Sequence, residues 1–348
     1  MTAREPPSPI VTLPKFRKGI DVLAFAPGSD DVLLAAEARR ALTVWDLHKP
    51  DEPVHVVESG TKVIGSRFWP DEGGLLVWSE QGAQVLDLAE EEVVAHIPAH
   101  EDRAEARNVA ARVLNSIGTG LSFVPMAAGG FWALLPILAS SASAQAHHYA
   151  SADVAPDASY VAMIAHNHRV YAHDIHTGEK LAEWKFAMSE RSRLVCLPSG
   201  RIAAGMNSKL LILEPGSKKP VVKRTAHLAG VRGLVRMPGG LIATIGENQN
   251  MRLWTEEGEK ASGLIKLRKQ VEEACPIDTT RLLARATNRR LYLIDTEDRP
   301  AMTILRVGDF KIHTIAVSDD GRRVALGCND KVVRIYETSS LVAQEAEA

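Results

Sequence analysis

Cysteines, aromatic side chains and an excess of either charge are all scarce in this 348-residue chain. Its three cysteines, Cys196, Cys275 and Cys328, lie far apart and show no CxxC spacing, so neither a disulfide framework nor a zinc knuckle is expected. Basic and acidic residues nearly balance, 41 against 43, which excludes a globally basic nucleic-acid-binding protein. Because 45% of the residues are hydrophobic and the net charge is only -2, the chain can fold around a core rather than stay disordered.

Motifs of common catalytic and cofactor sites are also missing. The serines lack the GxSxG pattern, and the glycines of 118–120 and 239–240 are not followed by the lysine of a phosphate-binding loop. Six of the twelve histidines gather between residues 147 and 176, but we expect a loop, a strand and the other end of the fold to separate them, which disfavours a metal site. We therefore expect no enzyme activity, catalytic residue, cofactor or metal.

Short apolar runs that end in a proline or aspartate turn recur along the chain. The turns are marked by Pro27, Pro70, Pro156, Pro198, Pro238, Asp278 and Asp319. Successive turns are about 40 to 43 residues apart, except for a double step of about 86 residues between Pro70 and Pro156. Runs rich in Val, Ile and Leu and broken by Pro, Gly and Asp are typical of short strands. The period therefore predicts an all-β chain whose units have four strands each.

Each unit also contains a later strand that ends in an acidic residue. These residues are Asp46, Asp87, Asp174, Glu214, Glu256, Asp295 and Glu337. In period and layout, and through the intact pair Trp45-Asp46, the chain resembles the WD40-repeat family. In that family a histidine, a serine or threonine, an aspartate and the tryptophan form a buried hydrogen-bonded network. The matching residues are His227, Thr244 and Trp254, with Asn248 in the place of the aspartate, and Asp330 in the last repeat.

The resemblance implies a single seven-bladed, WD40-like β-propeller over residues 10–344, with flexible termini at 1–9 and 345–348. The ring of a propeller closes when one terminus supplies a strand to the blade formed by the other, which removes open sheet edges. Two segments compete for that position here. Residues Ile10–Leu13 precede the first inner strand and Ser340–Gln344 follow the last repeat, and the sequence does not choose between them.

The double step holds an insertion, residues 99–148, between the second and third blades. Glu101–Ile117 has apolar residues at spacings of three and four and no proline, which predicts a helix. Residues 121–139 are apolar enough to suggest a membrane span, but one crossing would put blades on both sides of the bilayer and prevent ring closure. Three interpretations stay open: a helical segment folded against the propeller or a partner, which we favour, a shallow membrane-inserting element, and an eighth, degenerate blade.

In a propeller, the loops before the inner strands share one face with the loops between the second and third strands of each blade. Here these loops carry mostly basic residues, namely Lys15, Arg17, Lys18, Arg39, Arg40, Arg191, Arg193, Lys209, Lys266, Arg268, Lys269, Arg289, Arg290, Lys311 and Lys331. The opposite face collects acidic turn residues. Aspartates bond their own backbone in tight turns, which explains about half of the acidic face but not the paired arginines. We therefore expect a polarised disk whose local fields steer its partners.

The sequence predicts a non-catalytic scaffold or adaptor for protein–protein interaction that uses the basic face and the apolar insertion. Its partners would be one or more proteins with an acidic surface, and no nucleic acid is expected. The candidate partner-binding residues are Arg39, Arg40, Lys209, Arg289, Arg290, Lys331, Phe131, Trp132 and Leu135. The alternative is a membrane-surface protein that docks on anionic lipid through the basic loops and the 121–139 segment. The N-terminal residues lack the apolar run of a secretory signal, which predicts a cytoplasmic or membrane-associated location.

Overall fold

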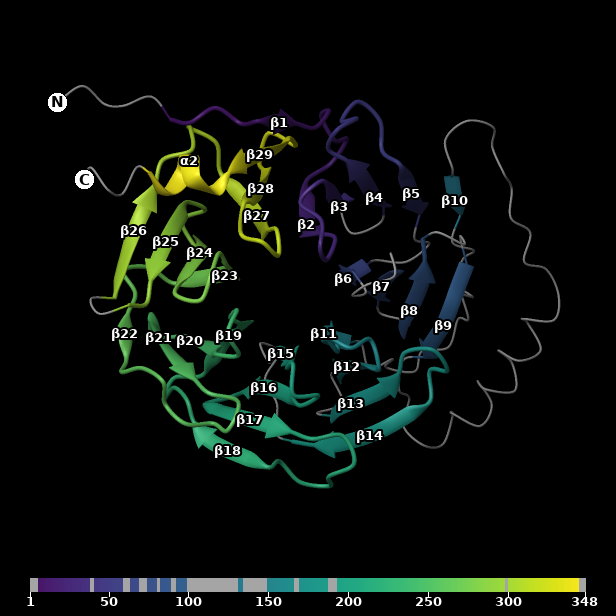
Figure 1. Ribbon diagram of the computed structural model, residues 1–348, viewed down its shortest axis with the longest axis vertical. Helices are drawn as coiled ribbons and strands as arrows, with labels where there is room; N and C mark the ends of the chain where they lie inside the picture. Colours follow the sequence, from purple (N-terminus) through teal and green to yellow (C-terminus); the bar gives the residue numbers. More distant parts are fainter. Residues whose placement is uncertain are drawn as a thin grey trace.

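Seven β-sheets form a closed ring in the computed structural model of the chain (Figure 1). The structure describes residues 6–37, 41–58, 63–68, 74–79, 82–88, 92–98, 131–133, 149–165, 169–186, 193–297 and 300–343. Each sheet contains four antiparallel strands, and one sheet has a fifth, parallel strand. The chain is thus an all-β, seven-bladed β-propeller. The prediction from the repeat period is confirmed, and the alternative of eight blades is wrong.

The strands of each blade follow one another from the inside of the ring to its rim. The first three blades contain β2 (Ile20–Phe25), β3 (Val32–Glu37), β4 (Ala41–Asp46) and β5 (His55–Glu58), then β6 (Val63–Phe68), β7 (Gly74–Ser79), β8 (Gly82–Asp87) and β9 (Glu92–Pro98), then β11 (Tyr149–Val154), β12 (Tyr160–Ala165), β13 (Arg169–Asp174) and β14 (Lys180–Lys185). Within the described residues, the proline and aspartate turns that mark the repeat follow the inner strands, as at Pro27 and Pro156.

The remaining blades repeat this order. They contain β15 (Arg193–Cys196), β16 (Ile202–Met206), β17 (Lys209–Leu213) and β18 (Val222–Thr225), then β19 (Val231–Arg236), β20 (Ile242–Gly246), β21 (Asn250–Trp254) and β22 (Ile265–Lys266), then β23 (Val271–Pro276), β24 (Arg281–Ala286), β25 (Leu291–Asp295) and β26 (Ala301–Leu305). The seventh blade combines β27 (Ile312–Val317), β28 (Arg323–Cys328) and β29 (Val333–Glu337) with β1 (Val11–Thr12).

The N-terminal segment closes the ring. Strand β1 pairs antiparallel with β29, and backbone bonds from Leu13 N to Val333 O (3.0 Å) and from Phe16 N to Lys331 O (2.9 Å) extend the contact. Leu13 is only 1% exposed, so the closing segment is anchored in the core. The competing C-terminal segment is in part a short helix, α2 (Thr338–Val342), which lies beside the seventh blade (Figure 1).

The hydrophobic core is divided among the contacts between neighbouring blades. Seven clusters of buried side chains occur in the described residues, and each draws its members from two adjacent blades. In one of them, Leu76 of blade 2 packs with Val161 of blade 3. Another joins Ile335 of blade 7 to Trp45 of blade 1, which completes the ring. Each fully buried Leu, Ile or Val contributes about 1.5–3 kcal/mol, so packing against its neighbours stabilises every blade.

The insertion returns to the rim of the ring within the described residues. Strand β10 (Phe131–Ala133) pairs parallel with β5 and adds a fifth strand to blade 1, with Phe131 opposite Val56. The predicted helix over 101–117 lies outside the described residues, as does most of the 121–139 segment. The described part of this apolar segment is therefore an edge strand on blade 1 rather than a helix.

Candidate interaction face

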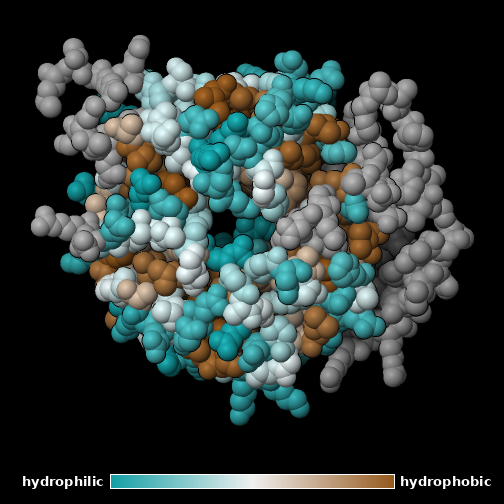
Figure 2. Space-filling view, in the orientation of Figure 1, coloured by the Kyte–Doolittle hydropathy of each residue, from teal (hydrophilic) through white to brown (hydrophobic). Residues whose placement is uncertain are grey.

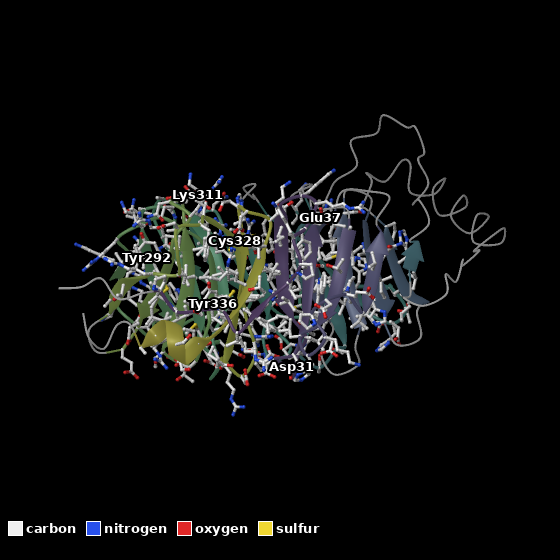
Figure 3. All side chains as sticks on the ribbon, turned by 90° about the horizontal axis from the view of Figure 1, so that it is seen from above. Asp31, Glu37, Tyr292, Lys311, Cys328 and Tyr336 are labelled. Atoms are coloured by element: carbon white, nitrogen blue, oxygen red, sulfur yellow. The ribbon has the colours of Figure 1, made fainter. Side chains whose placement is uncertain are left out.

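The ring has two faces, which Figure 3 shows edge-on. Lys311 and Glu37 lie on one face, together with many nitrogen-tipped side chains around Lys311, and Asp31 lies on the other. Lys311 is in the loop before inner strand β27, and Glu37 ends the second strand of blade 1. We call this side of the ring the basic face. The loops on it are those before the inner strands and those between the second and third strands of each blade.

Backbone hydrogen bonds link the loops of the basic face to one another. Six such bonds, 2.8–3.0 Å long, lie between Gly230 and Phe16. Three join a loop before an inner strand to the hairpin of the same blade, and three join it to the hairpin of the preceding blade. They pair Gly230 with Glu247, Gln249 with Leu267, Gln270 with Thr287, Arg289 with Ile312, Lys311 with Asn329 and Lys331 with Phe16. The side chains that these loops carry are therefore held on a continuous, hydrogen-bonded framework that runs from blade 4 to blade 1.

One half of this framework carries a run of exposed cations, which we call the basic arc. Its members are Arg268, Lys269, Arg289, Arg290, Lys311, Lys331, Arg17 and Lys18, all of them exposed. The carboxylates beside it are few. Asp330 is bound by Arg334 through two bonds of 2.5 and 3.1 Å, and Glu37 accepts a hydrogen bond from the backbone N–H of Lys18. Three carboxylates are exposed, namely Asp309, Asp21 and Glu272, and the last of these forms an ion pair with Arg285. The arc therefore keeps an excess of positive charge.

Two members of the basic arc have an unusual backbone conformation. Arg289 (φ 59°) and Lys331 (φ 68°) are left-handed, at the tips of the hairpins β24–β25 and β28–β29. Residues with a Cβ pay a strain energy there, which glycine would avoid. Lys331 Nζ donates to the carbonyl of Arg17 (2.9 Å), which gives that lysine a structural role. Arg289 has no hydrogen bond or ion pair of its side chain among the described residues. Asn207 and Gln249 share its left-handed conformation at the equivalent hairpins of blades 4 and 5, so the turn rather than the arginine sets this backbone conformation.

The structure brings together some of the residues selected from the sequence and separates others. Arg289, Arg290 and Lys331 lie in the basic arc. Lys209 is half-buried on blade 4, away from the arc, where its Nζ donates to Thr225 Oγ1 (2.7 Å). Phe131 and Trp132 lie in β10 at the rim, and Arg39, Arg40 and Leu135 lie outside the described residues.

Sequence reasoning missed one residue of this face. Leu228, in the loop before β19, is 90% exposed. The other large aliphatic residues that are exposed in the described chain are only 41–48% exposed, and they lie in or beside the outer strands at the rim. Their positions are Ile10, Val54, Val93, Leu181, Val221, Leu264 and Ile304. The sequence could have revealed Leu228, because it directly follows His227 and the repeat pattern places that position at the tip of a loop.

Acidic residues on the opposite face are used inside their own turns. Carboxylates accept backbone N–H groups two residues further on at 2.8–3.1 Å, in Asp46, Asp157, Asp174, Asp278, Asp295 and Asp320. The hydrogen bonds from Ser159 lower the pKa of Asp157, and those from Thr177 lower the pKa of Asp174. Turn chemistry therefore accounts for these acids, as predicted for part of this face.

The same face carries an ionic contact across the seam between blades 7 and 1. Arg323 of β28 forms an ion pair with Asp31 and donates to Asp30 O (3.0 Å), while His48 Nε2 lies 3.1 Å from Asp31 Oδ2. Burial opposes the ionisation of Asp31, but the Arg323 guanidinium outweighs it and lowers the pKa of that carboxyl. These groups hold the two ends of the chain together from the side opposite to the basic face.

The buried network of the fifth blade forms as the sequence predicts. Thr244 Oγ1 accepts a hydrogen bond from Trp254 Nε1 (2.9 Å) and lies 2.9 Å from His227 Nε2. A Cβ on Gly246 would come within 2.4 Å of Asn250 Oδ1, 2.7 Å of His227 Nδ1 and 2.8 Å of Asn248 Oδ1, so both amides lie near the histidine, and Asn250 is the buried one. Asn248 is exposed, and sequence reasoning did not select Asn250. Burial lowers the pKa of His227, which keeps the imidazole neutral.

Charged residues on the inner strands connect successive blades around a central opening, which Figure 2 shows lined by hydrophilic residues. Asp153 of β11 binds Arg67 Nε of β6 (3.0 Å) and accepts from Cys196 N of β15 (2.8 Å). Glu273 of β23 accepts from Thr314 Oγ1 (3.0 Å) and Ile315 N (3.2 Å) of β27. Both oxygens of each acid are thus engaged in contacts between blades, which leaves neither placed as a general base.

The cysteines are unsuited to nucleophilic chemistry. Burial and the nearby Asp153 carboxylate raise the pKa of Cys196 well above its usual value, and burial raises the pKa of Cys275 and of Cys328 to about 12. A thiol in such surroundings stays protonated and inert at neutral pH. Among the residues that the structure describes, no group of three or more His, Cys, Asp and Glu side chains could hold a metal ion. No helix in the same part of the chain is both long and apolar enough to cross a membrane.

Comparison with known proteins identifies the fold and no closer relationship. No family model and no curated protein sequence matches the chain. Many solved structures are similar to it. One of them, a chain in the crystal structure of a mitotic checkpoint complex, superposes with a TM-score of 0.69 over 97% of this chain and 94% of its own length, at 15% sequence identity. At that identity the likeness shows a shared propeller fold.

Proposed function

We propose that this protein is a non-catalytic, WD40-like scaffold that binds other proteins on its basic face, with the apolar insertion as a second contact. The observation that carries the proposal is the basic arc. Exposed cations are held on hydrogen-bonded loops of a closed ring, and the side chain of one of them, Arg289, has no hydrogen bond or ion pair among the described residues. An exposed arginine that no described carboxylate neutralises supports a role in binding.

Two further features support a protein partner. The similar propeller named above belongs to a crystal structure of a multi-component complex, the mitotic checkpoint complex. The acids of the inner strands and the cysteines, which would be the natural candidates for catalysis, are engaged in structural contacts or held protonated. A rigid surface with few exposed carboxylates of its own suits an acidic protein partner, because electrostatic complementarity speeds and orients association.

The insertion favours the same function over docking on a membrane. Within the described residues, its Phe131–Ala133 stretch pairs with β5 at the rim of blade 1. Backbone groups used in this pairing tie the segment to the propeller, whereas a membrane-inserting element needs a free apolar face. The insertion leaves blade 2 after β9 on the side of the basic face, so a partner seated on that face can reach it.

Affinity purification from cells of the source organism tests the proposal. One variant reverses the charge of Arg39, Arg40, Arg289 and Arg290 together, a second lacks residues 101–146, and a control variant carries Lys218→Glu and Lys219→Glu on the opposite face. We expect the first two variants to lose partners that the wild type and the control recover. Undiminished recovery by both, with circular dichroism spectra like that of the wild type, would refute the proposal.

A further inference from the structure

The most exposed apolar residue and the basic arc lie on the same framework of loops. Leu228 is 90% exposed in the loop 226–230, and Gly230 of this loop is bonded to Glu247 of the next hairpin (3.0 Å). From there the backbone bonds continue through the loop that carries Arg268 to the hairpin that carries Arg289. An apolar side chain thus stands at one end of a hydrogen-bonded path whose other end is positively charged.

The two ends of this path have different chemistry. Around Leu228 the loops carry few charges, with Asn207, Asn248 and Gln249 at the neighbouring hairpin tips. From Arg268 to Lys18 the loops carry the eight exposed cations of the basic arc, and Asp309 is the one exposed carboxylate of those loops in the described chain. Isolated exposed aliphatic residues are common on protein surfaces. Leu228 is therefore a candidate contact residue only because it lies at one end of the loops that carry the basic arc.

We infer that these loops form a two-part docking site for an extended, acidic protein segment, whose single large apolar side chain covers Leu228 and whose carboxylates follow the basic arc. The inference rests on the proposed function and names the chemistry of the partner. Arg289 and Arg290 are suited to carboxylates because a guanidinium can bind both oxygens at once. Because the loops are already hydrogen-bonded to one another, a bound segment loses little energy in ordering them.

Other anionic partners fit this surface less well. Single-stranded nucleic acids bind through aromatic side chains on which their bases stack. Here Phe16 is buried against Trp45, with ring centroids 5.7 Å apart, and Phe310 is covered by the Arg334 guanidinium at 4.3 Å. A lipid surface is bound through several apolar side chains in one plane, whereas the described loops of this face offer Leu228 alone.

Fluorescence anisotropy with labelled synthetic peptides tests the inference on the full-length protein. The probe has one leucine followed by a run of glutamates, and two control peptides replace the leucine by serine or the glutamates by glutamine. We expect the probe to bind more tightly than either control. The Leu228→Ala variant should weaken binding of the probe about tenfold at low and at high salt, because the lost contact is apolar. The same variant should not change binding of the peptide that lacks leucine.

Charge reversal tests the other end of the site. Arg289→Glu combined with Lys311→Glu should weaken binding of the probe by about a hundredfold or more at low salt, and should flatten its dependence on salt. Two control variants carry the same types of substitution at other surface positions: Leu264→Ala at the rim, and Lys218→Glu with Lys219→Glu on the opposite face. We expect each of these controls to bind the probe as the wild type does, and unfolding midpoints establish that all variants are folded.

The inference is overturned if Leu228→Ala binds the probe like the wild type, or if the opposite-face reversal weakens binding as much as the arc reversal. It is also overturned if vesicles containing phosphatidylserine or single-stranded DNA bind more tightly than the probe and depend on the same residues. Absence of peptide binding, together with loss of partners by the charge-reversed variant in affinity purification, would refute this inference and leave the proposed function intact. Undiminished purification of partners would refute the proposed function itself.

Discussion

The buried network of blade 5 gives the sharpest test of how a single hydroxyl stabilises this fold. In the Thr244→Val variant the shape of the side chain is kept and only the hydroxyl is lost. That hydroxyl accepts from Trp254 Nε1 (2.9 Å), lies 2.9 Å from His227 Nε2 and donates to Arg252 O (3.2 Å). His227 Nε2 keeps a second neighbour, Thr244 O at 3.1 Å, so the indole N–H of Trp254 is the group left without a partner.

The magnitude follows from these contacts. A buried donor left unsatisfied costs about 1–3 kcal/mol, and each hydrogen bond that is lost adds about 0.5–1.5 kcal/mol. We therefore expect Thr244→Val to lower the free energy of unfolding by about 2–3 kcal/mol. Blade 1 supplies a matched control, because Trp45 Nε1 donates to Thr43 Oγ1 (2.8 Å) without a histidine. Thr43 is half-buried, so water can replace its hydroxyl and Thr43→Val should cost only about 1 kcal/mol.

Urea unfolding followed by tryptophan fluorescence and circular dichroism measures both variants. A double-mutant cycle with Trp254→Phe isolates the contact, because Thr244→Val should cost less once the indole N–H is absent. Equal costs for Thr244→Val and Thr43→Val, or no coupling between positions 244 and 254, would show that the network does not stabilise the blade as the geometry indicates.

Four further predictions address closure, pH, strain and thiol chemistry. Leu13→Ala should lower the free energy of unfolding by about 2–5 kcal/mol, because the side chain is 1% exposed on the closing segment, whereas Ile10→Ala at 47% exposure should cost well under half as much in the same urea titration. Burial lowers the pKa of His96, His173, His227 and His313, so the unfolded chain binds protons that the folded chain does not. Stability should therefore fall as the pH drops below about 6.5, with a limiting slope of about 5 kcal/mol per pH unit. A flat stability curve between pH 7.5 and 5.5 would contradict the burial of these rings. Arg289→Asn should raise the free energy of unfolding by about 0.5–1 kcal/mol, because asparagine tolerates the left-handed conformation, and it should weaken binding of the acidic peptide. A lower free energy of unfolding would show that Arg289 is not strained. Ellman's reagent should titrate no cysteine in the native protein and three after denaturation, and rapid reaction of Cys275 in the native state would contradict its raised pKa.

The fold was predictable because the turns after the inner strands draw on the same few residue types. Pro156, Pro198 and Pro238 follow their inner strands at steps of 42 and 40 residues, and that spacing is visible without any coordinates. Ring closure was not predictable, because both ends of the chain offered a segment of strand length. Both segments bury a leucine, Leu13 between blades 7 and 1 and Leu341 between blades 6 and 7, but only the N-terminal segment pairs with β29, while Thr338–Val342 forms a helix.

The candidate site could be predicted in part, since it depends on contacts between blades. Arg289, Arg290 and Lys331 were identified because loop positions follow from the repeat. The pairing of β10 with β5, on a different blade from the one that carries the insertion, leaves no pattern in the sequence. Asn250 joins Asn248 beside the histidine because Gln249 adopts a left-handed conformation (φ 57°) in a three-residue hairpin turn, which places residue 250 on the strand.

The near balance of charges in the composition hides a difference in how the two faces use them. On the acidic face, carboxylates such as Asp174 and Asp278 are bound by the N–H groups of their own turns, and Asp31 by Arg323. Their fields are therefore partly cancelled at short range. On the basic face, the exposed side chains of Arg289, Arg290 and Lys311 have no ion pair among the described residues. A residue count thus underestimates the asymmetry that an approaching partner meets, and an acidic partner is steered to the basic face at a rate that should fall steeply with ionic strength.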